Sequence, residues 1–278
     1  MKGRIIGMKK LSKIYLALVF MFLYVPIFVM IVFSFNTTKS KTVFEGFTLD
    51  WYAKLFQNEL ILTSLRTTLL VSTISAVFST ILGTAAAIGF SKMKKVPKTI
   101  ALNINNIPII NPEIVTGVSL MLLFVFYSAR MNFEFGFITL LLAHITFDAP
   151  YVVLNVMPKL RQMDPHISEA AQDLGCNPVS AFFKVVMPEI MPGVLSGFLM
   201  SFAYSLDDFV ISYFTTGSSA QTLPITIYSM TRRKVSPEVN ALSTIIFLVV
   251  VSVLLVKNFI ERRNIKKMSR EALKSIKD

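Results

Sequence analysis

The sequence predicts an all-α membrane protein with six transmembrane helices. Of its 278 residues 54% are apolar, and the mean hydropathy is +0.63. Apolar runs of about 20 residues recur, which is the length that crosses roughly 30 Å of hydrocarbon, and a spanning helix satisfies its own backbone hydrogen bonds. The predicted spans are residues 14–35, 64–90, 107–127, 135–157, 194–214 and 242–260.

The first span is predicted to be uncleaved, because its apolar run is too long for a signal peptide and no small-residue cleavage site follows it. Between the first two spans, a short amphipathic helix is expected to begin near Thr48 or Asp50. Trp51 and Tyr52 in that helix are residue types that favour a membrane interface. The second span is long enough to tilt in the bilayer or to extend beyond it.

The basic residues explain both the charge and the orientation. The formal net charge is +12, and most Lys and Arg residues lie beside the spans on one predicted side. The positive-inside rule therefore places both termini in the cytoplasm and makes the bilayer, rather than a nucleic acid, the partner of this charge. The expected parts are a cytoplasmic N-terminus at 1–13, one membrane domain at 14–260 and a basic tail at 261–278. The cluster 232–234 is a local exception.

Few residues in the chain are suited to catalysis or metal binding. Cys176 is the only cysteine, so no intrachain disulfide can form. His144 and His166 have no metal-ligand partner at a useful spacing, and no hydrolase or metalloprotease motif is present. A phosphate-binding loop is also missing, so the chain is not expected to hydrolyse ATP. These observations predict a non-enzymatic protein without a metal or cofactor of its own.

The most informative segment is a cytoplasmic helix-turn-helix at about 158–192, between the fourth and fifth spans. Asp164-Pro165 and Asn177-Pro178 each combine a helix-capping side chain with a proline at the first helical position. Gly175 supplies a left-handed stop between the two helices. One helix is therefore expected over 165–174 and a second from Pro178, with Pro188 and Pro192 interrupting or kinking the second.

The first of these helices has two different faces. Ile167, Ala170, Ala171 and Leu174 share one face by their spacing, while Glu169, Gln172 and Asp173 lie around the other side. Two alanines leave no bulk, so a partner protein could approach closely. The alternative is an ordinary loop between two spans, but the segment is doubly capped and contains few flexible residues.

The predicted spans contain four acidic residues, which are Glu113, Asp148, Asp207 and Asp208. The interiors of these spans contain no Lys or Arg. Because an unpaired charge at membrane depth is costly, the four carboxylates indicate a cationic substrate. Glu113 follows Asn111-Pro112, where we expect a helix break, and a place near a helix N-terminus is the simpler role for it. For Asp148, before another proline, pore lining and backbone capping remain equally open.

Asp207 and Asp208 point about 100° apart on a helix. On a continuous helix, Asp208 would share one polar stripe with Ser201, Tyr204, Ser212 and Thr215. We therefore predict that Asp208 faces a substrate path while Asp207 is hydrogen-bonded within the bundle. In the alternative, both carboxylates are structural. Tyr204 could offer a ring face for a cation–π contact, with helix packing as its simpler role.

The helix-turn-helix resembles the EAA loop of ABC importer permeases. Glu169, Ala170, Ala171, Gly175 and Pro188 match that motif at its spacing, while Val185 and Met187 depart from it conservatively. In that family the loop docks into a groove on an ATP-hydrolysing subunit. The resemblance implies that the coupling element is formed by Glu169, Ala170, Ala171, Asp173, Leu174 and Gly175.

A second resemblance covers most of the chain. Residues 47–56, 205–217, 222–230 and 235–243 are similar to the C-type permeases of spermidine/putrescine importers. This implies the type I, MetI-like permease architecture and import of polyamines by alternating access in a bacterial inner membrane. It also implies three partners: a second homologous permease, a dimer of ATPase subunits that hold ATP and Mg²⁺, and an extracellular or periplasmic binding protein.

Other functions fit the sequence less well. Importer permeases for oxyanions, opines or iron share parts of these motifs, but anion transport would favour buried basic residues. Ion-coupled carriers usually contain internal repeats, and none is visible here. A channel would need a filter or gate motif, which the sequence also does not show.

Overall fold

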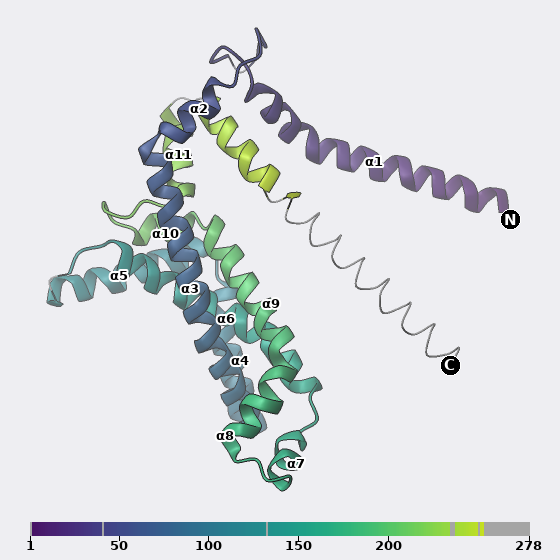
Figure 1. The fold of residues 1–278 in the computed structure, drawn as a ribbon, viewed down its shortest axis with the longest axis vertical. Helices are drawn as coiled ribbons and strands as arrows, with labels where there is room; N and C mark the ends of the chain where they lie inside the picture. Colours follow the sequence, from purple (N-terminus) through teal and green to yellow (C-terminus); the bar gives the residue numbers. More distant parts are fainter. Residues whose placement is uncertain (1, 41, 132, 234–236, 250, 253–278) are drawn as a thin grey trace. The chain divides into compact units, whose positions relative to one another are not determined.

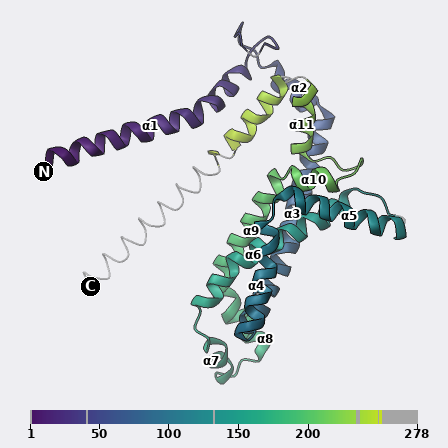
Figure 2. The same cartoon turned by 180° about the vertical axis from the view of Figure 1, so that it is seen from behind.

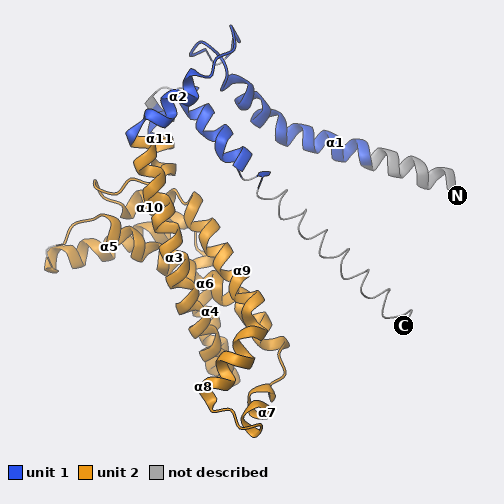
Figure 3. Cartoon of the chain, viewed as in Figure 1, with its two compact units in different colours: residues 1–59, 229–278 blue, residues 60–228 orange. Residues whose placement is uncertain are grey.

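The computed structural model describes residues 2–40, 42–131, 133–233, 237–249 and 251–252, and this part of the chain is helical apart from its loops. The labelled elements (Figures 1 and 2) are α1 Lys2–Phe33, α2 Asp50–Gln57, α3 Glu59–Lys92, α4 Lys95–Ile110, α5 Glu113–Met131, α6 Phe137–Gln162, α7 Ile167–Asp173, α8 Pro178–Ala181, the π-helical turn η1 Phe182–Val186, α9 Met187–Asp207, α10 Val210–Thr215 and α11 Leu223–Arg233. The described residues form no β-strand beyond an isolated bridge between Asn36 and Phe47. Two compact units are present: residues 1–59 with 229–278, and residues 60–228 (Figure 3).

Five described helices are long and apolar enough to cross a membrane. They span Lys13–Phe33, Glu59–Lys92, Glu113–Met131, Phe137–Gln162 and Pro178–Asp207. The predicted sixth span, 242–260, lies largely outside the described residues, and its described part falls in a shorter apolar helix, Pro237–Val249. The all-α membrane fold predicted from the apolar runs is thereby confirmed.

The third predicted span, 107–127, is wrong as one continuous helix. α4 ends at Ile110, Asn111 is extended (φ −68°, ψ 143°), and α5 begins at Glu113. A residue before proline is pushed out of the helical region, so Asn111 and Pro112 separate the two helices. The break expected at this dipeptide is confirmed.

The fifth predicted span, 194–214, is also displaced. Its helix begins at Pro178 and ends at Asp207, because Asp208 adopts an extended conformation (φ −61°, ψ 122°). The chain then resumes as the short helix α10, which packs against α5. The apolar helix is therefore continuous with the second helix of the helix-turn-helix and is broken near its other end.

The second unit is built on the pairing of α6 with α9, with α3 alongside both (Figures 1 and 2). Val152, Val156 and Ile190 form a buried apolar cluster where these helices meet. Glycine allows the close approach of α3 to α6: a Cβ atom added at Gly83 would lie 2.8 Å from the carbonyl oxygen of Ala149. Small residues at helix crossings are typical of membrane bundles, which gain much of their stability from tight van der Waals packing.

In the first unit, a loop between α1 and α2 folds around Asn36. The Asn36 side chain donates to the Val43 carbonyl (2.8 Å) and accepts from the Glu45 amide (3.0 Å), and the Asn36 carbonyl accepts from the Trp51 indole N–H (2.7 Å). The predicted short helix is confirmed as α2. The Trp51 side chain is only 6% exposed and is held by the Asn36 carbonyl, and its expected place at the membrane interface stays a prediction.

Candidate functional site

The predicted cytoplasmic helix-turn-helix is present between α6 and α9. At the end of α7, Gly175 has φ +91°, the Gly175 amide donates to Gln172 O (2.8 Å) and the Cys176 amide donates to Ala171 O (3.1 Å). This pair of bonds is a Schellman motif, in which glycine supplies the left-handed residue without strain. The stop predicted at Gly175 is confirmed.

The start of this helix differs from the prediction by two residues. α7 begins at Ile167 rather than Pro165, with His166 as the residue before it. The Asp164 carboxylate accepts from the His166 amide (2.9 Å), so it closes a turn ahead of the helix rather than capping the helix itself. Asn177 does cap α8 as predicted, since its side chain accepts from the Ser180 amide (2.7 Å) and Pro178 occupies the first turn.

The second helix continues past Pro188, so of the two predicted alternatives, interruption or kinking, the interruption does not occur. A π-helical turn, η1, lies directly before α9, and the Met187 amide reaches back to Phe182 O across it. A proline has no N–H to donate, and in an α-helix its ring crowds the carbonyl four residues earlier. The wider spacing of a π-helical turn changes the positions of these groups, so the helix can continue past Pro188. Pro192 lies within α9. The second half of the helix-turn-helix is therefore joined directly to a helix of membrane-spanning length.

The structure separates the two alanines that were predicted to share a partner-facing surface. Ala171 is buried (8% exposed), whereas Ala170 is exposed. Leu174, one turn beyond Ala170, is 89% exposed, the highest exposed fraction among the large apolar side chains of the described residues. Ala170 and Leu174 thus form the outward face of α7, and Ala171 packs the helix onto its own chain. Glu169, Gln172 and Asp173 are also exposed.

Glu169, in the first turn of α7, interacts with the histidine that precedes this helix. The His166 Nδ1 atom lies 2.9 Å from Glu169 Oε2, and both side chains are largely exposed. The hydrogen bond and the negative charge of Glu169, together with the charge of Asp164, raise the pKa of His166 above its usual value of 6.5. His166 is therefore charged, and its contact with Glu169 fully formed, below its usual pKa of 6.5. The charged contact is lost as the pH rises through the raised pKa of His166.

This contact gives a direct prediction for the pKa of His166. Glu169→Gln is expected to lower it towards 6.5, because the substitution removes the carboxylate whose hydrogen bond, first, and charge, second, raise this pKa. The measurement is an NMR titration of the His166 ring in the detergent-solubilised chain. Asp173→Asn is the matched control, since Asp173 is exposed on the same helix and does not contribute to the shift. An unchanged pKa in Glu169→Gln would show that the contact does not form in solution.

A second group of functional candidates lies where α9 gives way to α10. The Asp208 carboxylate accepts from the amides of Ile211 (3.2 Å) and Ser212 (2.7 Å), so it caps α10. The polar stripe predicted on one continuous helix is therefore wrong, because the helix ends at Asp207. Asp208 is buried (8% exposed) and Asp207 is exposed, which reverses the expectation that Asp207 is the carboxylate enclosed by the bundle.

His144 is the residue at the centre of this region that sequence reasoning missed. Its Nδ1 atom lies 2.6 Å from Ser205 Oγ, and its Nε2 atom lies 3.0 Å from Ser212 Oγ and 3.5 Å from Asp208 Oδ2. The imidazole on α6 thus joins both sides of the break between α9 and α10. One signal was available: any ionisable side chain inside a predicted span needs a polar partner.

Further polar side chains extend this cluster along α3. Ser75 Oγ donates to Ser205 Oγ (3.0 Å), and the hydroxyls of Ser79 and Ser201 lie 2.7 Å apart. Asp148 is fully buried, and neither of its oxygens has a partner in good hydrogen-bonding geometry within the described chain, although Ser75, Ser201 and Asp208 lie close enough to interact with it. The described residues form no cluster of three or more typical metal ligands.

The predicted path residues therefore divide into two groups. Asp148, Asp208 and Ser212 belong to the buried cluster, whereas Asp207 and Tyr204 do not. Tyr204 is partly exposed and stacks on Tyr151, with ring centroids 4.4 Å apart. The role of each of these residues in transport stays a prediction.

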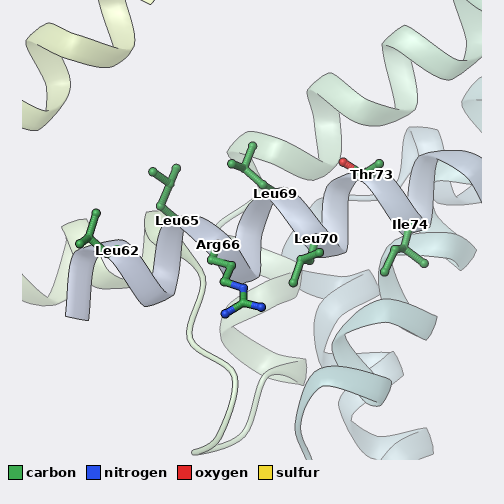
Figure 4. Close-up of a pocket in the computed structure, with 7 residues that line it drawn as sticks. All are labelled: Leu62, Leu65, Arg66, Leu69, Leu70, Thr73 and Ile74. Carbon is green, nitrogen blue, oxygen red and sulfur yellow. The ribbon is translucent and has the colours of Figure 1, made fainter. Parts of the chain in front are cut away.

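A shallow groove of about 400 Å³ lies elsewhere, along the outer face of α3 (Figure 4). Its lining is apolar except for Arg66 and Thr73, and consists of Leu62, Leu65, Arg66, Leu69, Leu70, Thr73 and Ile74. None of the acidic candidates lines it. The groove is therefore distinct from both candidate sites.

Comparison with known proteins agrees with this architecture. A solved bacterial ABC transporter that imports the acidic polysaccharide alginate has the same fold, with a TM-score of 0.67 and 14% identity, over 93% of this chain and 96% of that one. The putrescine transport permease PotI of Escherichia coli K12 is 38% identical over 235 residues, covering 83% of each chain. The spermidine/putrescine transport permease PotC of the same strain is 35% identical over 252 residues, covering 91% of this chain and 94% of that one.

The family comparison covers most of the second unit and the residues that follow it. Residues 79–270, which include α7, η1, α9 and all of the buried cluster except Ser75, match the model of one transporter family. The chain belongs to the family of inner-membrane components of binding-protein-dependent transport systems.

Proposed function

We propose that this permease moves polyamines, with putrescine and spermidine as the expected substrates, into the cell. The observation that carries the proposal is the set of acids in the second unit. Glu113, Asp148 and Asp207 form no ion pair with a Lys or Arg residue in the described part of the chain, and Asp208 is paired only with His144. Uncompensated carboxylates at membrane depth favour a polycation that neutralises them in transit. The relatives named for putrescine and spermidine transport support the same substrate class.

The energy would come from partner subunits. The chain contains no phosphate-binding loop, so ATP and Mg²⁺ are assigned to a separate ATPase dimer. ATP binding would close that dimer and move α7, and the continuous helix from Pro178 to Asp207 would carry the movement into the membrane. The substrate path would then open alternately to each side. This arrangement requires α7 and both termini to be cytoplasmic.

Two further partners complete the proposed importer. A second, homologous permease would provide the other half of the path, since the five described apolar helices present much exposed apolar surface. A binding protein outside the membrane would deliver the substrate and set much of its selectivity. In support, one solved transporter of the same fold was crystallised with its substrate-bound periplasmic protein.

The direct test is uptake of labelled putrescine and spermidine by cells that lack this permease and by the same cells after its return. We expect uptake to fall to background without the chain and to recover when it is restored. Competition with unlabelled opines, iron chelates and oxyanions controls for the other solutes of related importers. Normal polyamine uptake without the chain, or uptake blocked by one of those solutes, would contradict the proposed substrate.

A further inference from the structure

We infer that the groove along α3 binds an anionic phospholipid, with the lipid phosphate on Arg66 and one acyl chain along the apolar side chains beside it (Figure 4). The groove lies away from the acidic candidates of the substrate path, so the inference does not depend on which solute the permease moves. All of its lining residues belong to α3 and to the second compact unit.

Two neighbouring rows of side chains form this groove. Residues four apart on a helix line up as ridges on its surface. One ridge contains Leu65 and Leu69. The next contains Arg66, Leu70 and Ile74, which Figure 4 shows along the other side of the helix. Leu69 and Leu70 are each 44% exposed, so the chain itself leaves the walls of the groove open. The ridges run for about two turns, or roughly 12 Å, a length that one acyl chain can cover.

Arg66 supplies the charge that selects the head group. Between Glu59 and Lys92 at the two ends of α3, it is the only charged residue of this helix. Arg66 is exposed and forms no ion pair within the described part of the chain. A guanidinium can donate two parallel N–H bonds to a phosphate. An anionic lipid is favoured over a zwitterionic one, because the cation of a zwitterionic head group competes with Arg66 for the phosphate.

The position of Arg66 along α3 suits a head group. The helix has 34 residues, and at about 1.5 Å per residue it is roughly 20 Å longer than the hydrocarbon layer. With this excess shared between its ends, each boundary of the hydrocarbon lies about 10 Å from a helix end. Arg66 lies about two turns, or roughly 10 Å, from the first residue of α3. Its guanidinium can therefore reach the lipid phosphates while the groove continues into the apolar layer.

A second protein helix suits this groove less well than a lipid. Helices pack against each other in membranes mainly through small residues. α3 carries such residues on its buried face, where Ser75 and Ser79 contact α9 and Gly83 contacts α6. The groove instead has four leucines and an isoleucine. A protein carboxylate buried against Arg66 would also have to lose its hydration, whereas a lipid head group keeps part of its own.

The test is photolabelling in proteoliposomes, with the full-length permease and the subunits that copurify with it. The membrane contains photoactivatable phosphatidylglycerol, or photoactivatable phosphatidylcholine with the same acyl chains. Peptide mass spectrometry then measures the lipid attached within residues 62–74. We expect phosphatidylglycerol to label this segment about five- to tenfold more than phosphatidylcholine, and Arg66→Gln to remove that difference. Arg66→Lys keeps the charge without the paired N–H groups and should retain part of the preference.

Arg130→Gln is the matched control, because Arg130 is an exposed cation in the last turn of the apolar helix α5. It should leave the labelling of residues 62–74 unchanged. Equal labelling by the two lipids would mean that only bulk lipid passes this face, and an equal effect of Arg130→Gln would mean that only overall charge matters. Either result would overturn the inference. Folded wild-type protein that neither lipid labels would also overturn it, because another protein then covers the groove.

Thermal unfolding of the detergent-solubilised permease gives a second measurement. A ligand that binds only the folded state raises the unfolding midpoint. Phosphatidylglycerol should therefore raise the midpoint of the wild type by about 2–4 °C more than phosphatidylcholine does, and Arg66→Gln should lose this extra shift. Size-exclusion chromatography confirms that Arg66→Gln is folded before the comparison, as expected for an exposed side chain without an ion pair in the described chain. An extra shift that persists in this variant would show that the lipid binds elsewhere.

Discussion

Gly83→Ala is expected to destabilise the helix bundle by about 1–3 kcal/mol, which is the usual cost of adding a methyl group to a closely packed core. An added Cβ would lie 2.6 Å from Val152 Cβ and 2.8 Å from the Ala149 carbonyl oxygen. Neither contact is with the end of a flexible side chain, so α3 would have to move away from α6. That movement would also disturb the hydroxyl contacts that α3 makes with α9.

The matched control lies less than two turns further along the same helix. A Cβ added at Gly89 meets nothing within 4 Å, so Gly89→Ala should be neutral or slightly stabilising through helix propensity. The measurement is thermal unfolding of the detergent-solubilised permease, followed by the loss of its monodisperse size-exclusion peak. Equal unfolding midpoints for the two variants would show that α3 and α6 are less closely packed than in this structure.

The features that were predictable from the sequence are those that neighbouring residues determine. Apolar runs of sufficient length predicted most of the membrane helices, because hydrocarbon thickness sets their length. The stop at Gly175 and the cap at Asn177 were also predictable, since each is made by groups within five residues. The break at Asn111 follows from the proline next to it.

The errors occur where contacts distant in sequence determine the conformation. No glycine or proline marks the end of α9. The extended Asp208 instead contacts His144, which lies 64 positions earlier in the chain. His144 also contacts Ser205 and Ser212, one on each side of the break. The contact between the Trp51 indole and the Asn36 carbonyl, 15 positions earlier in the chain, was likewise not predictable from the sequence. The polar residues at the break after α9 were visible in the apolar runs, but their partners were not.

The same reasoning explains why the residues of the helix-turn-helix were predicted correctly while the exposure of its two alanines was not. Helical spacing placed Ala170 and Ala171 on neighbouring positions, but only the packing of α7 against its own chain shows which of them faces outward. The loop therefore has an inner residue, Ala171, and an outer pair, Ala170 and Leu174. These two groups should respond differently to substitution.

Leu174→Asp should reduce ATP-driven uptake at least tenfold while leaving the permease folded. Leu174 is 89% exposed, so its replacement removes little packing within the chain. If α7 docks on the proposed ATPase, burial of this leucine would contribute about 1.5–3 kcal/mol to the complex, and an aspartate there would have to lose its hydration instead. Copurification of the ATPase with the permease and uptake in proteoliposomes are the two measurements.

Two further substitutions on α7 make this result specific. Gln172→Ala changes an exposed residue away from the outer pair and should leave both docking and uptake near wild-type values. Ala171→Leu adds bulk at a buried position and should lower thermal stability, a defect that Leu174→Asp should not share. Normal copurification and uptake in Leu174→Asp would mean that α7 does not transmit force through its exposed face. If Leu174→Asp loses both copurification and uptake while its unfolding midpoint is unchanged, the exposed face of α7 is the contact through which ATP drives the membrane helices.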